Sequence, residues 1–362
     1  MDRPSSGVTP PRTTEQQLPG TRPGPEASTD RRCDTAARPQ RPRLPETEAA
    51  LTMRQAVRGW LQRYRPDGPV AVALSGGADS LALTAAAVVE AEAVDALIVD
   101  HGLQEGSAAV ATEAAALARR LGCRSARISR VSVHGPGGME AAARRARYDA
   151  LNRMRDGVPV LFGHTLDDQA ETVLLGLARG SGQRSLQGMA EFAEPWGRPL
   201  LGVRREATRA LCADLGLRPH EDPHNSAPEF TRVRVRTEVL PLLEQVLGGG
   251  AAPALARTAA QLREDGEVLD AIAGKLLTDA RAGSGLSVEI LATAPAAIRR
   301  RAIRTWLTEG GAKSLTHKQL RAIEALVTDW RGQGGVAVGG GMPGIRLVAG
   351  RERGTLTLAF AR

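Results

Sequence analysis

Lysine, cysteine and long apolar runs are scarce in this chain of 362 residues, and each scarcity excludes something. No apolar stretch approaches the ~20 residues that span a bilayer, and the polar, proline-rich start has no apolar signal segment. We therefore expect no contact with a membrane. The three cysteines, Cys33, Cys123 and Cys212, form no C-x-x-C pair, so neither a zinc knuckle nor a disulfide framework is indicated. These absences favour a reduced, cytoplasmic protein.

Positive charge is present in excess, and nearly all of it is arginine. The only lysines are Lys275, Lys313 and Lys318, while the net charge is +8. Residues 1–48 hold eight arginines against seven acidic residues, so +7 of the +8 belongs to the rest of the chain. This excess predicts a polyanionic partner. A GC-rich codon bias, which favours arginine without any functional demand, is the alternative explanation.

Residues 1–48 differ in composition from everything that follows. They contain nine of the 22 prolines and no aromatic residue. Such a segment cannot bury enough apolar area to offset the entropy lost on ordering, so we predict a disordered tail. Alternatively, translation begins at Met53 and the tail is not made.

From residue 49 onward, short apolar runs alternate with helical patterns, which predicts an α/β domain with a doubly wound parallel sheet. In such a sheet, ligands bind at the carboxyl ends of the strands. The segments Ser75–Ser80, Asp100–His101 and His164 all follow predicted strands, so we expect them to line one crevice. The expected strands are 70–74, 95–102, 125–133 and 158–164, and the expected helices are 49–64, 79–92, 108–121, 139–155 and 166–178.

Beyond residue 185 the pattern is less regular and mostly helical. The strongest break is "GGGAAP", Gly248–Pro253. We expect a catalytic domain over 49–225 and a smaller, mostly helical substrate-binding domain over 226–362. In the first domain a further helix is predicted over 204–215. The second domain is predicted to contain a basic helix over 230–247, helices over 254–280, 288–309 and 316–330, and two short strands near 336–348 and 354–359.

The turn "SGGADS", Ser75–Ser80, joins the first strand to a helix. Glycines let backbone N–H groups wrap an anion, and the start of a helix favours negative charge. The turn lacks the lysine of a G-x-x-x-x-G-K-[ST] loop, and its adjacent glycines do not fit G-x-G-x-x-G. Asp79 would repel phosphate unless it binds Mg²⁺ that bridges phosphate oxygens. An ordinary helix cap made by Ser or Asp is the alternative.

A second polar group follows the fourth strand. His164, Asp168 and Glu171 are spaced by four and three residues, which predicts one shared helix face. A histidine beside two carboxylates could position an amine and accept its proton, and two acids would suit a cationic substrate. The alternative is a solvated acidic first turn.

Arginines form the third group of candidates. Arg144 and Arg147 lie one turn apart and suit negative charge on phosphate, or else form solvated pairs with acids. Five arginines are expected to contact RNA phosphates, unless they are merely solvated surface: Arg147, Arg179, Arg184, Arg232 and Arg236.

The motif "SGGADS" matches the S-G-G-x-D-S signature of the PP-loop ATP pyrophosphatases, which the chain therefore resembles. Four further stretches narrow the resemblance to the tRNA-isoleucine lysidine synthetases: "VDHGL" (Val99–Leu103), "MEAAARRARYDAL" (Met139–Leu151), "GHTLDDQAETVLLGLARGSG" (Gly163–Gly182) and "EDPHNSAPEFTRVRVRTEVLPLLE" (Glu221–Glu244). The resemblance is strong over about 50–245 and weaker beyond.

This resemblance implies a reaction, its substrates and its site residues. ATP adenylates the C2 oxygen of the wobble cytidine in an isoleucine tRNA with a CAU anticodon, and the ε-amine of free lysine then displaces AMP to give lysidine. The implied catalytic residues are Asp79, Arg144, His164, Asp168 and Glu171. The implied nucleotide-binding residues are Ser75, Gly76, Gly77, Ala78, Asp79, Ser80, Val99 and His101, with Mg²⁺ at Asp79. The oligomeric state is left open between a monomer and a homodimer.

Three rival functions stay open from the sequence. A PP-loop tRNA thiolase would generally need reactive cysteines, whereas Cys123 and Cys212 are unpaired and lie outside the motifs. An ammonia-using synthetase of the same superfamily would not need a basic second domain. A non-catalytic tRNA-binding module would not need an intact SGGADS loop together with the HxxDDxxET element.

Overall fold

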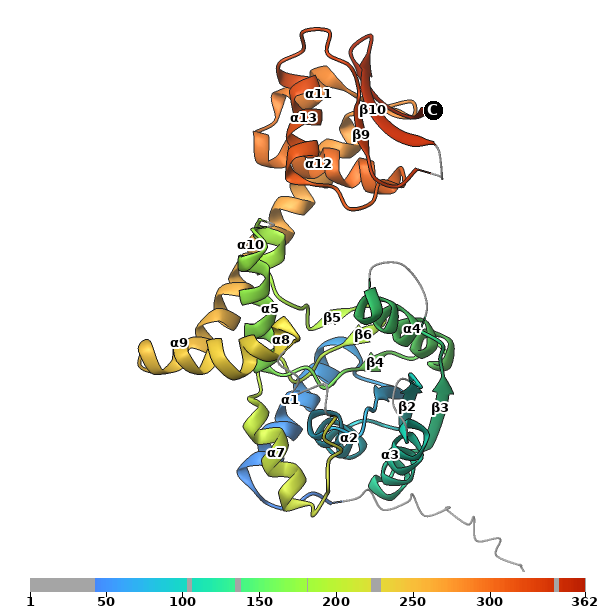
Figure 1. Ribbon diagram of the computed structural model, residues 1–362, viewed down its shortest axis with the longest axis vertical. Helices are drawn as coiled ribbons and strands as arrows, with labels where there is room; N and C mark the ends of the chain where they lie inside the picture. The colour runs from blue at the N-terminus through green and yellow to red at the C-terminus, as the bar shows by residue number, and fades with distance from the viewer. Residues whose placement is uncertain are drawn as a thin grey trace, which may run out of the picture. The chain divides into compact units, whose positions relative to one another are not determined.

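The structure is a computed structural model that describes residues 43–102, 106–133, 138–180, 182–222, 229–341 and 345–361. Its first part contains a six-stranded sheet in the order β3-β2-β1-β4-β6-β5, in which all neighbouring strands are parallel except β5 and β6 (Figure 1). The strands are β1 Val70–Ala73, β2 Val94–Asp100, β3 Ser125–Arg130, β4 Val160–Leu161, β5 Phe192–Ala193 and β6 Trp196–Gly197. The helices are α1 Glu48–Tyr64, α2 Ala78–Glu90, α3 Ser107–Leu121, α4 Gly138–Met154, α5 Leu166–Ala178, α6 Gln183–Leu186 and α7 Arg205–Asp214.

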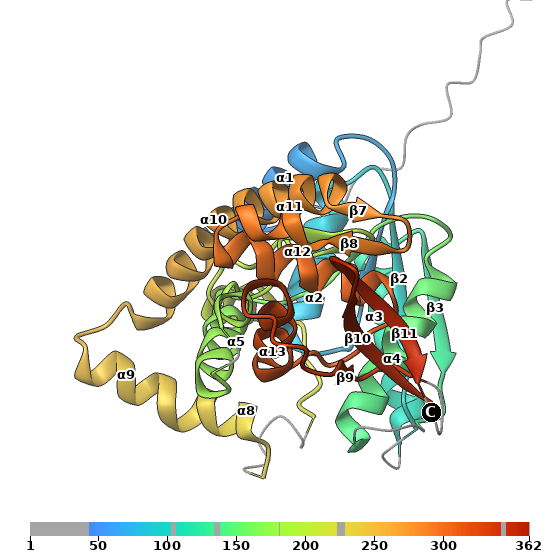
Figure 2. The same cartoon turned by 90° about the horizontal axis from the view of Figure 1, so that it is seen from above.

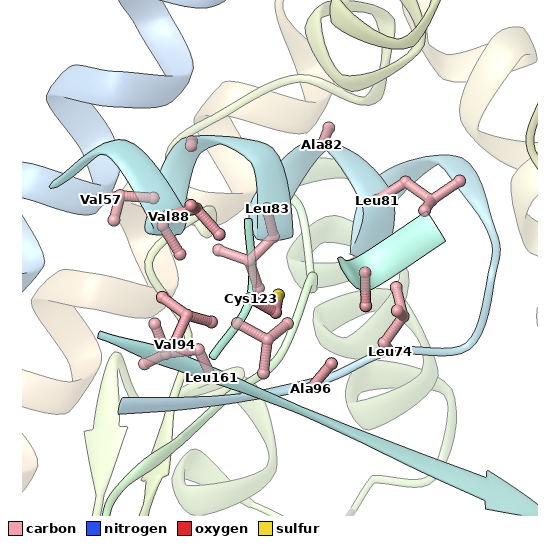
Figure 3. Packing of buried hydrophobic residues seen from close by; sticks show 14 of the residues in the cluster. Val57, Leu74, Leu81, Ala82, Leu83, Val88, Val94, Ala96, Cys123 and Leu161 are labelled. Atoms are coloured by element: carbon pink, nitrogen blue, oxygen red, sulfur yellow. The ribbon is translucent and has the colours of Figure 1, made fainter. Parts of the chain in front are cut away.

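Alternation along β1 places helices on both faces of this sheet. Val70, Val72 and Leu74 pack with side chains from α1, α2, α3 and α7 in one buried cluster. Ala71 and Ala73 point the other way, into a cluster with side chains of α4. Figure 3 shows the first cluster, where α2 side chains meet those of the strands. The predicted doubly wound α/β fold is therefore confirmed for this part of the chain.

The chain changes direction at β1. It runs from β1 to β2 and β3 on one side, and then returns to place β4 on the other side of β1. Ligands of open parallel sheets bind at such a switch point, outside the carboxyl ends of the strands. The segments after β1 and β4 are the Ser75–Ser80 turn and Gly163–His164, so the topology brings these two motifs together.

The second part holds its own sheet and its own core. Strands β7 Arg281–Ala282, β8 Gly285–Ser287, β11 Thr355–Ala361, β10 Arg346–Glu352 and β9 Val336–Val338 form an antiparallel sheet in that order. Helices α11 Val288–Thr293, α12 Ala296–Glu309 and α13 His317–Thr328 share a buried cluster with it. In Figures 1 and 2, α13 lies beside β9 and β10. Two strands were expected here, so the sheet is larger than predicted.

The two parts are joined by helices α8 Thr231–Arg234, η2 Val235–Val239, α9 Leu240–Val246 and the 29-residue α10 Ala251–Asp279. Val235, Leu240 and Ala252 pack against Leu166 and Ala170 of α5. The separate C-terminal cluster begins only at Ala273. The side chains of α10 therefore contribute to both buried clusters, and the boundary expected after residue 225 stays a prediction.

The expected tail ends in residues that the structure describes. Thr47 caps α1 through its side chain, which accepts from the N–H of Ala50, and Leu44 packs against the core. Within the described ranges no single helix is long and apolar enough to cross a membrane. One bent pair, Thr231–Val246 with Ala251–Asp279, passes that test by length and composition only.

Candidate active site

The SGGADS turn is held at the start of α2 by bonds within itself: the N–H of Ser75 donates to Oγ of Ser80 at 3.2 Å, and that of Gly77 to Oγ of Ser75 at 3.4 Å. The residue that caps the helix is Gly77, which has no side chain to cap with. Gly76 takes a positive φ of 84°, which glycine tolerates best. The hydroxyl of Ser80 donates to the carbonyl of Gly77 at 2.9 Å and lies 3.1 Å from that of Ser75. The turn is thus not an ordinary Ser or Asp cap, and its geometry suits an anion.

A cavity of about 370 Å³ opens beside this turn at the carboxyl ends of β1 and β2. Its wall includes four of the eight residues expected to bind the nucleotide, Ser75, Gly77, Val99 and His101, but not Gly76, Ala78, Asp79 and Ser80. Arg147, expected on RNA, also lines it. Burial lowers the pKa of His101, and Arg147 lowers it further, so the imidazole is neutral. Among the described atoms, its Nδ1 is buried without a hydrogen-bond partner.

Two residues at the start of the stretch that follows α7 also close this cavity, although neither was expected to bind the nucleotide. His220 and Asp222 line the wall, and the N–H of His220 donates to the carbonyl of Gly76 at 2.9 Å. An ideal Cβ on Gly76 would lie 3.6 Å from that of His220. This segment therefore rests directly on the phosphate loop.

Asp79 points away from the turn toward α7. Its Oδ1 accepts from the hydroxyl of Thr208 at 2.5 Å, and its Oδ2 accepts from Nε of Arg205 at 3.4 Å. Burial nevertheless raises the pKa of Asp79, because the two bonds only partly offset the loss of water. A half-buried carboxylate beside a phosphate loop fits Mg²⁺, which needs one or two carboxylates besides phosphates and water. Within the described residues, no cluster of three or more metal-binding side chains occurs.

Asp168 stands in the first turn of α5, where the sequence predicted the helix start correctly. Its Oδ2 accepts from the backbone N–H and the hydroxyl of Thr165 at 2.8 and 2.9 Å, which forms a capping box. Its Oδ1 accepts from Nη2 of Arg205 at 2.8 Å and of Arg236 at 3.3 Å. Burial raises the pKa of Asp168, but Arg205 and Thr165 outweigh it and hold that pKa below its ordinary value.

Glu171 lies one turn further along α5 and is fully buried. It accepts from Nε of Arg236 at 2.7 Å, from Nε of Arg232 at 2.8 Å and from Nη1 of Arg205 at 3.4 Å. Arg232 and Arg236 were expected on the RNA. Instead they face the acids that were expected to meet the lysine amine, so three guanidinium groups balance Asp79, Asp168 and Glu171.

His164 does not lie on the helix face that the spacing predicted. The helix starts at Leu166 with Thr165 as its cap, and His164 precedes both. Its ring stacks on Phe162 at 5.5 Å between centroids. Burial lowers the pKa of His164 to about 3, against the opposing effect of Asp168. Its Nδ1 is also buried without a partner among the described atoms, so the neutral ring can accept a hydrogen bond there.

Arg144 and Arg147 meet aromatic rings on the same side of the sheet. Arg144 donates to the hydroxyl of Tyr148 at 3.3 Å and lies over that ring, while Arg147 lies over the ring of Phe162. Burial lowers the pKa of Arg147, but a guanidinium keeps its charge at neutral pH. Arg147 thus lies near His164 and lines the nucleotide cavity, whereas Arg144 is held against Tyr148.

The remaining expected RNA contacts lie away from this centre. Arg184 pairs with Asp270 of α10 at 2.8 Å, and Arg179 follows the last residue of α5 on the surface. Arg205 and Thr208 were not predicted at all. Only the fold shows that α7 crosses the start of α2, since nothing in the spacing between residues 79 and 205 indicates it.

The described cysteines are buried thiols. Burial raises the pKa of Cys123 to about 12 and that of Cys212 to about 11. Neither is a thiolate at neutral pH, which counts against the thiolase alternative. Cys33 lies outside the described residues.

Comparison with known proteins agrees with these motifs. The sequence matches the PP-loop domain family over residues 48–243 and the TilS substrate binding domain over 286–357. A protein from Nocardia farcinica is 72% identical over 308 residues, covering 84% of this chain and 97% of its own. One from Rhodococcus erythropolis is 66% identical over 317 residues, covering 88% and 98%. Both are named tRNA(Ile)-lysidine synthase, and the predicted resemblance is confirmed: this chain belongs to the tRNA(Ile)-lysidine synthase family.

Proposed function

We propose that this chain ligates free lysine to C2 of the wobble cytidine of a CAU-anticodon isoleucine tRNA, with ATP converted to AMP and pyrophosphate. One observation supports this most directly. A single guanidinium, that of Arg205, contacts Asp79 of the phosphate loop and both Asp168 and Glu171. The loop that would hold the nucleotide and the acids that follow β4 therefore form one site.

In this proposal the Ser75–Ser80 turn binds the phosphates of ATP, and the cavity beside Val99 and His101 holds the nucleoside. Mg²⁺ at Asp79 would neutralise phosphate charge. The cytidine O2 attacks the α-phosphate, pyrophosphate leaves, and Arg144 and Arg147 stabilise the negative charge that develops. Adenylation turns a poor leaving oxygen into a good one.

His164 is the group that we assign to the second step. The ε-amine of lysine attacks C2, the C2–O bond breaks, and AMP leaves with that oxygen. The attacking amine must lose a proton, which passes to water, while the neutral imidazole accepts a hydrogen bond from the amine and holds it against C2. The charges of Asp168 and Glu171 are already balanced by arginines. We therefore propose that these two acids hold Arg205, Arg232 and Arg236 in place where the substrate lysine would bind, and that they do not bind its ammonium group by themselves.

The proposal also covers the extent of the domains, the location of the enzyme and its oligomeric state. We propose that the catalytic domain extends into α10, beyond the expected boundary after residue 225, and that the C-terminal domain contributes to tRNA binding. We also propose a cytoplasmic enzyme. A homodimer stays a prediction, which sedimentation of the purified protein would test.

The proposal is tested with α-labelled ATP, lysine and a CAU-anticodon isoleucine tRNA transcript. AMP release is measured with each component omitted in turn, and labelled lysine is followed into RNA. We expect lysine-labelled RNA only when all three are present. AMP release driven by ammonia or a sulfur donor, with no lysine in the RNA, would assign the chain to a rival PP-loop activity, and no AMP at all would leave only RNA binding.

A further inference from the structure

The arginines that the sequence assigned to RNA are largely engaged elsewhere in the fold. Arg147 lines the nucleotide cavity, Arg184 pairs with Asp270, and Arg232 and Arg236 pair with Glu171. Since +7 of the net charge lies outside residues 1–48, other cations must face the solvent. Their position decides where an RNA backbone could be held.

A second hollow, of about 390 Å³, lies between the end of β3 and α4. It is lined by Arg130, Val131 and Ser132 from the strand side and by Ala142, Arg145, Ala146, Asp149 and Arg153 from α4. The residues from α4 recur every three or four positions and so share one helix face. Three arginines against one aspartate give the lining a net charge of +2.

These guanidinium groups are accessible. The side chain of Arg130 is 74% exposed, and its one ion pair in the described structure is a loose one, 3.9 Å from Asp100. Arg145 and Arg153 are exposed as well. Within the described part of the chain, Arg153 makes no ion pair with an acid. The hollow offers small apolar side chains and no aromatic ring, which suits phosphate better than a stacked base.

The hollow adjoins the nucleotide cavity. The Nε of Arg130 would lie 3.4 Å from a Cβ on Gly102, and Gly102 lines that cavity with Asp100 and His101. Arg147 and Leu151 face the cavity from the opposite side of α4. The two sites are thus separated by roughly one helix diameter, about 10 Å.

We propose that Arg130, Arg145 and Arg153 form a phosphate site for the RNA backbone, which holds nucleotides near the target cytidine while that base enters the active site. This inference rests on the proposed function, since it assumes an RNA substrate. Phosphate contacts of this kind fix position without reading sequence. The same chemistry could also attract inorganic phosphate or ATP, and the test separates these sources.

The test compares two triple variants with equal change in charge. R130Q/R145Q/R153Q removes the three arginine charges that line the hollow, while R119Q/R120Q/R209Q removes three exposed arginines from α3 and α7. Affinity for a labelled isoleucine tRNA transcript is measured over a salt series. For the hollow variant we expect roughly tenfold weaker binding, and a slope of log K against log salt that is shallower by about 2 to 3. A second tRNA of different sequence should lose affinity by the same factor.

Several outcomes would overturn the phosphate site. An unchanged slope, or an equal loss in the α3/α7 control, would show that the hollow does not hold RNA. Weaker binding of ATP or inorganic phosphate by the hollow variant, with unchanged affinity for tRNA, would assign the hollow to free anions. The variant R130K/R145K/R153K keeps the charge and should recover binding, which controls for misfolding. Lysine transfer by the wild-type protein is measured in parallel. If no lysine is transferred, the proposed function is wrong, whatever the tRNA affinity of the hollow variant.

Discussion

At the scale of single residues, Glu171 is a buried carboxylate whose charge is balanced entirely by arginines. Its carboxylate is fully buried and accepts from three guanidinium groups. Glu171→Gln would leave those cations without their buried counter-charge, a change that typically costs about 3 kcal/mol or more. We expect a loss of that size in the free energy of unfolding, measured with urea at neutral pH.

Glu238 supplies the matched control for this prediction. It pairs with Arg234 one turn earlier on the same helical segment, and both side chains are exposed. Glu238→Gln should hardly change the unfolding free energy, because exposed pairs contribute little. Equal effects of the two substitutions would mean that the buried cluster is not what stabilises this region.

His164 gives a prediction about pH. Its folded-state pKa of about 3 lies below the ordinary value of 6.5. Below pH 6.5 this imidazole is therefore protonated in the unfolded chain but stays neutral in the folded chain. The stability of the wild-type protein should therefore fall relative to His164→Gln as the pH drops from 6.5, by at most about 1.4 kcal/mol per unit. Above pH 7 the difference should be constant. Urea unfolding of both proteins at pH 7.5, 6 and 5 measures it, and parallel curves would refute the depressed pKa.

Residue types within motifs were predictable, but their partners were not. The spacing of His164, Asp168 and Glu171 identified the right neighbourhood, because all three follow one strand. It failed to show that Arg205 and Arg236 neutralise the acids, since those contacts join positions 34 to 68 residues apart. Long-range ion pairs depend on how helices cross, which spacing along the chain does not encode.

At the scale of elements, the contact between the loop after β4 and the start of α2 joins the two motifs. A Cβ on Gly163 would lie 2.8 Å from the carbonyl carbon and oxygen of Asp79 and 3.0 Å from the N–H nitrogen of Ser80. Backbone atoms cannot move aside as a side chain can. Gly163→Ala should therefore displace the phosphate loop, destabilise the fold by about 1–3 kcal/mol and weaken ATP binding several-fold.

Gly202→Ala is the control for the Gly163 prediction, since nothing lies within 4 Å of a Cβ at Gly202. It should leave ATP binding and stability close to those of the wild-type protein. Titration of each protein with ATP, together with its urea unfolding curve, makes the comparison. Normal ATP affinity in Gly163→Ala would mean that the loop tolerates displacement.

Elements with local start and stop signals were predicted well. Helix α5 spans the expected residues, and the capping box of Thr165 and Asp168 explains where it begins. The helix expected over 288–309 is instead two helices, separated at Ala294–Pro295, where proline interrupts the pattern. The short strands β7 and β8 were missed, since β8 is defined by pairing with β11, and β7 by pairing with β8, and neither has a long apolar run.

At the scale of the whole molecule, composition indicated a division of the chain, but packing decided its position. Gly248, Gly249 and Gly250 all take positive φ between α9 and α10, so the helical segment is interrupted there. Yet α10 packs on α5 near its start and joins the C-terminal core near its end. A single long helix thus belongs to both cores, which a scan for flexible linkers cannot detect.

Asp270, in the middle of α10, is where the two matched domains are tied by charge. One oxygen accepts from Arg184 of α6 at 2.8 Å and the other from Arg301 of α12 at 2.6 Å, while Arg301 also donates to Gln183. Asp270→Asn should weaken these contacts by about 1 kcal/mol, and so raise KM for tRNA roughly fivefold if the RNA contacts both domains. Asp265→Asn, on the same helix but exposed and without an ion pair in the described structure, should not change KM. ATP affinity should stay the same in both variants, because neither residue touches the nucleotide cavity. An unchanged KM for tRNA in Asp270→Asn would show that the enzyme acts on RNA without a fixed arrangement of α6, α10 and α12.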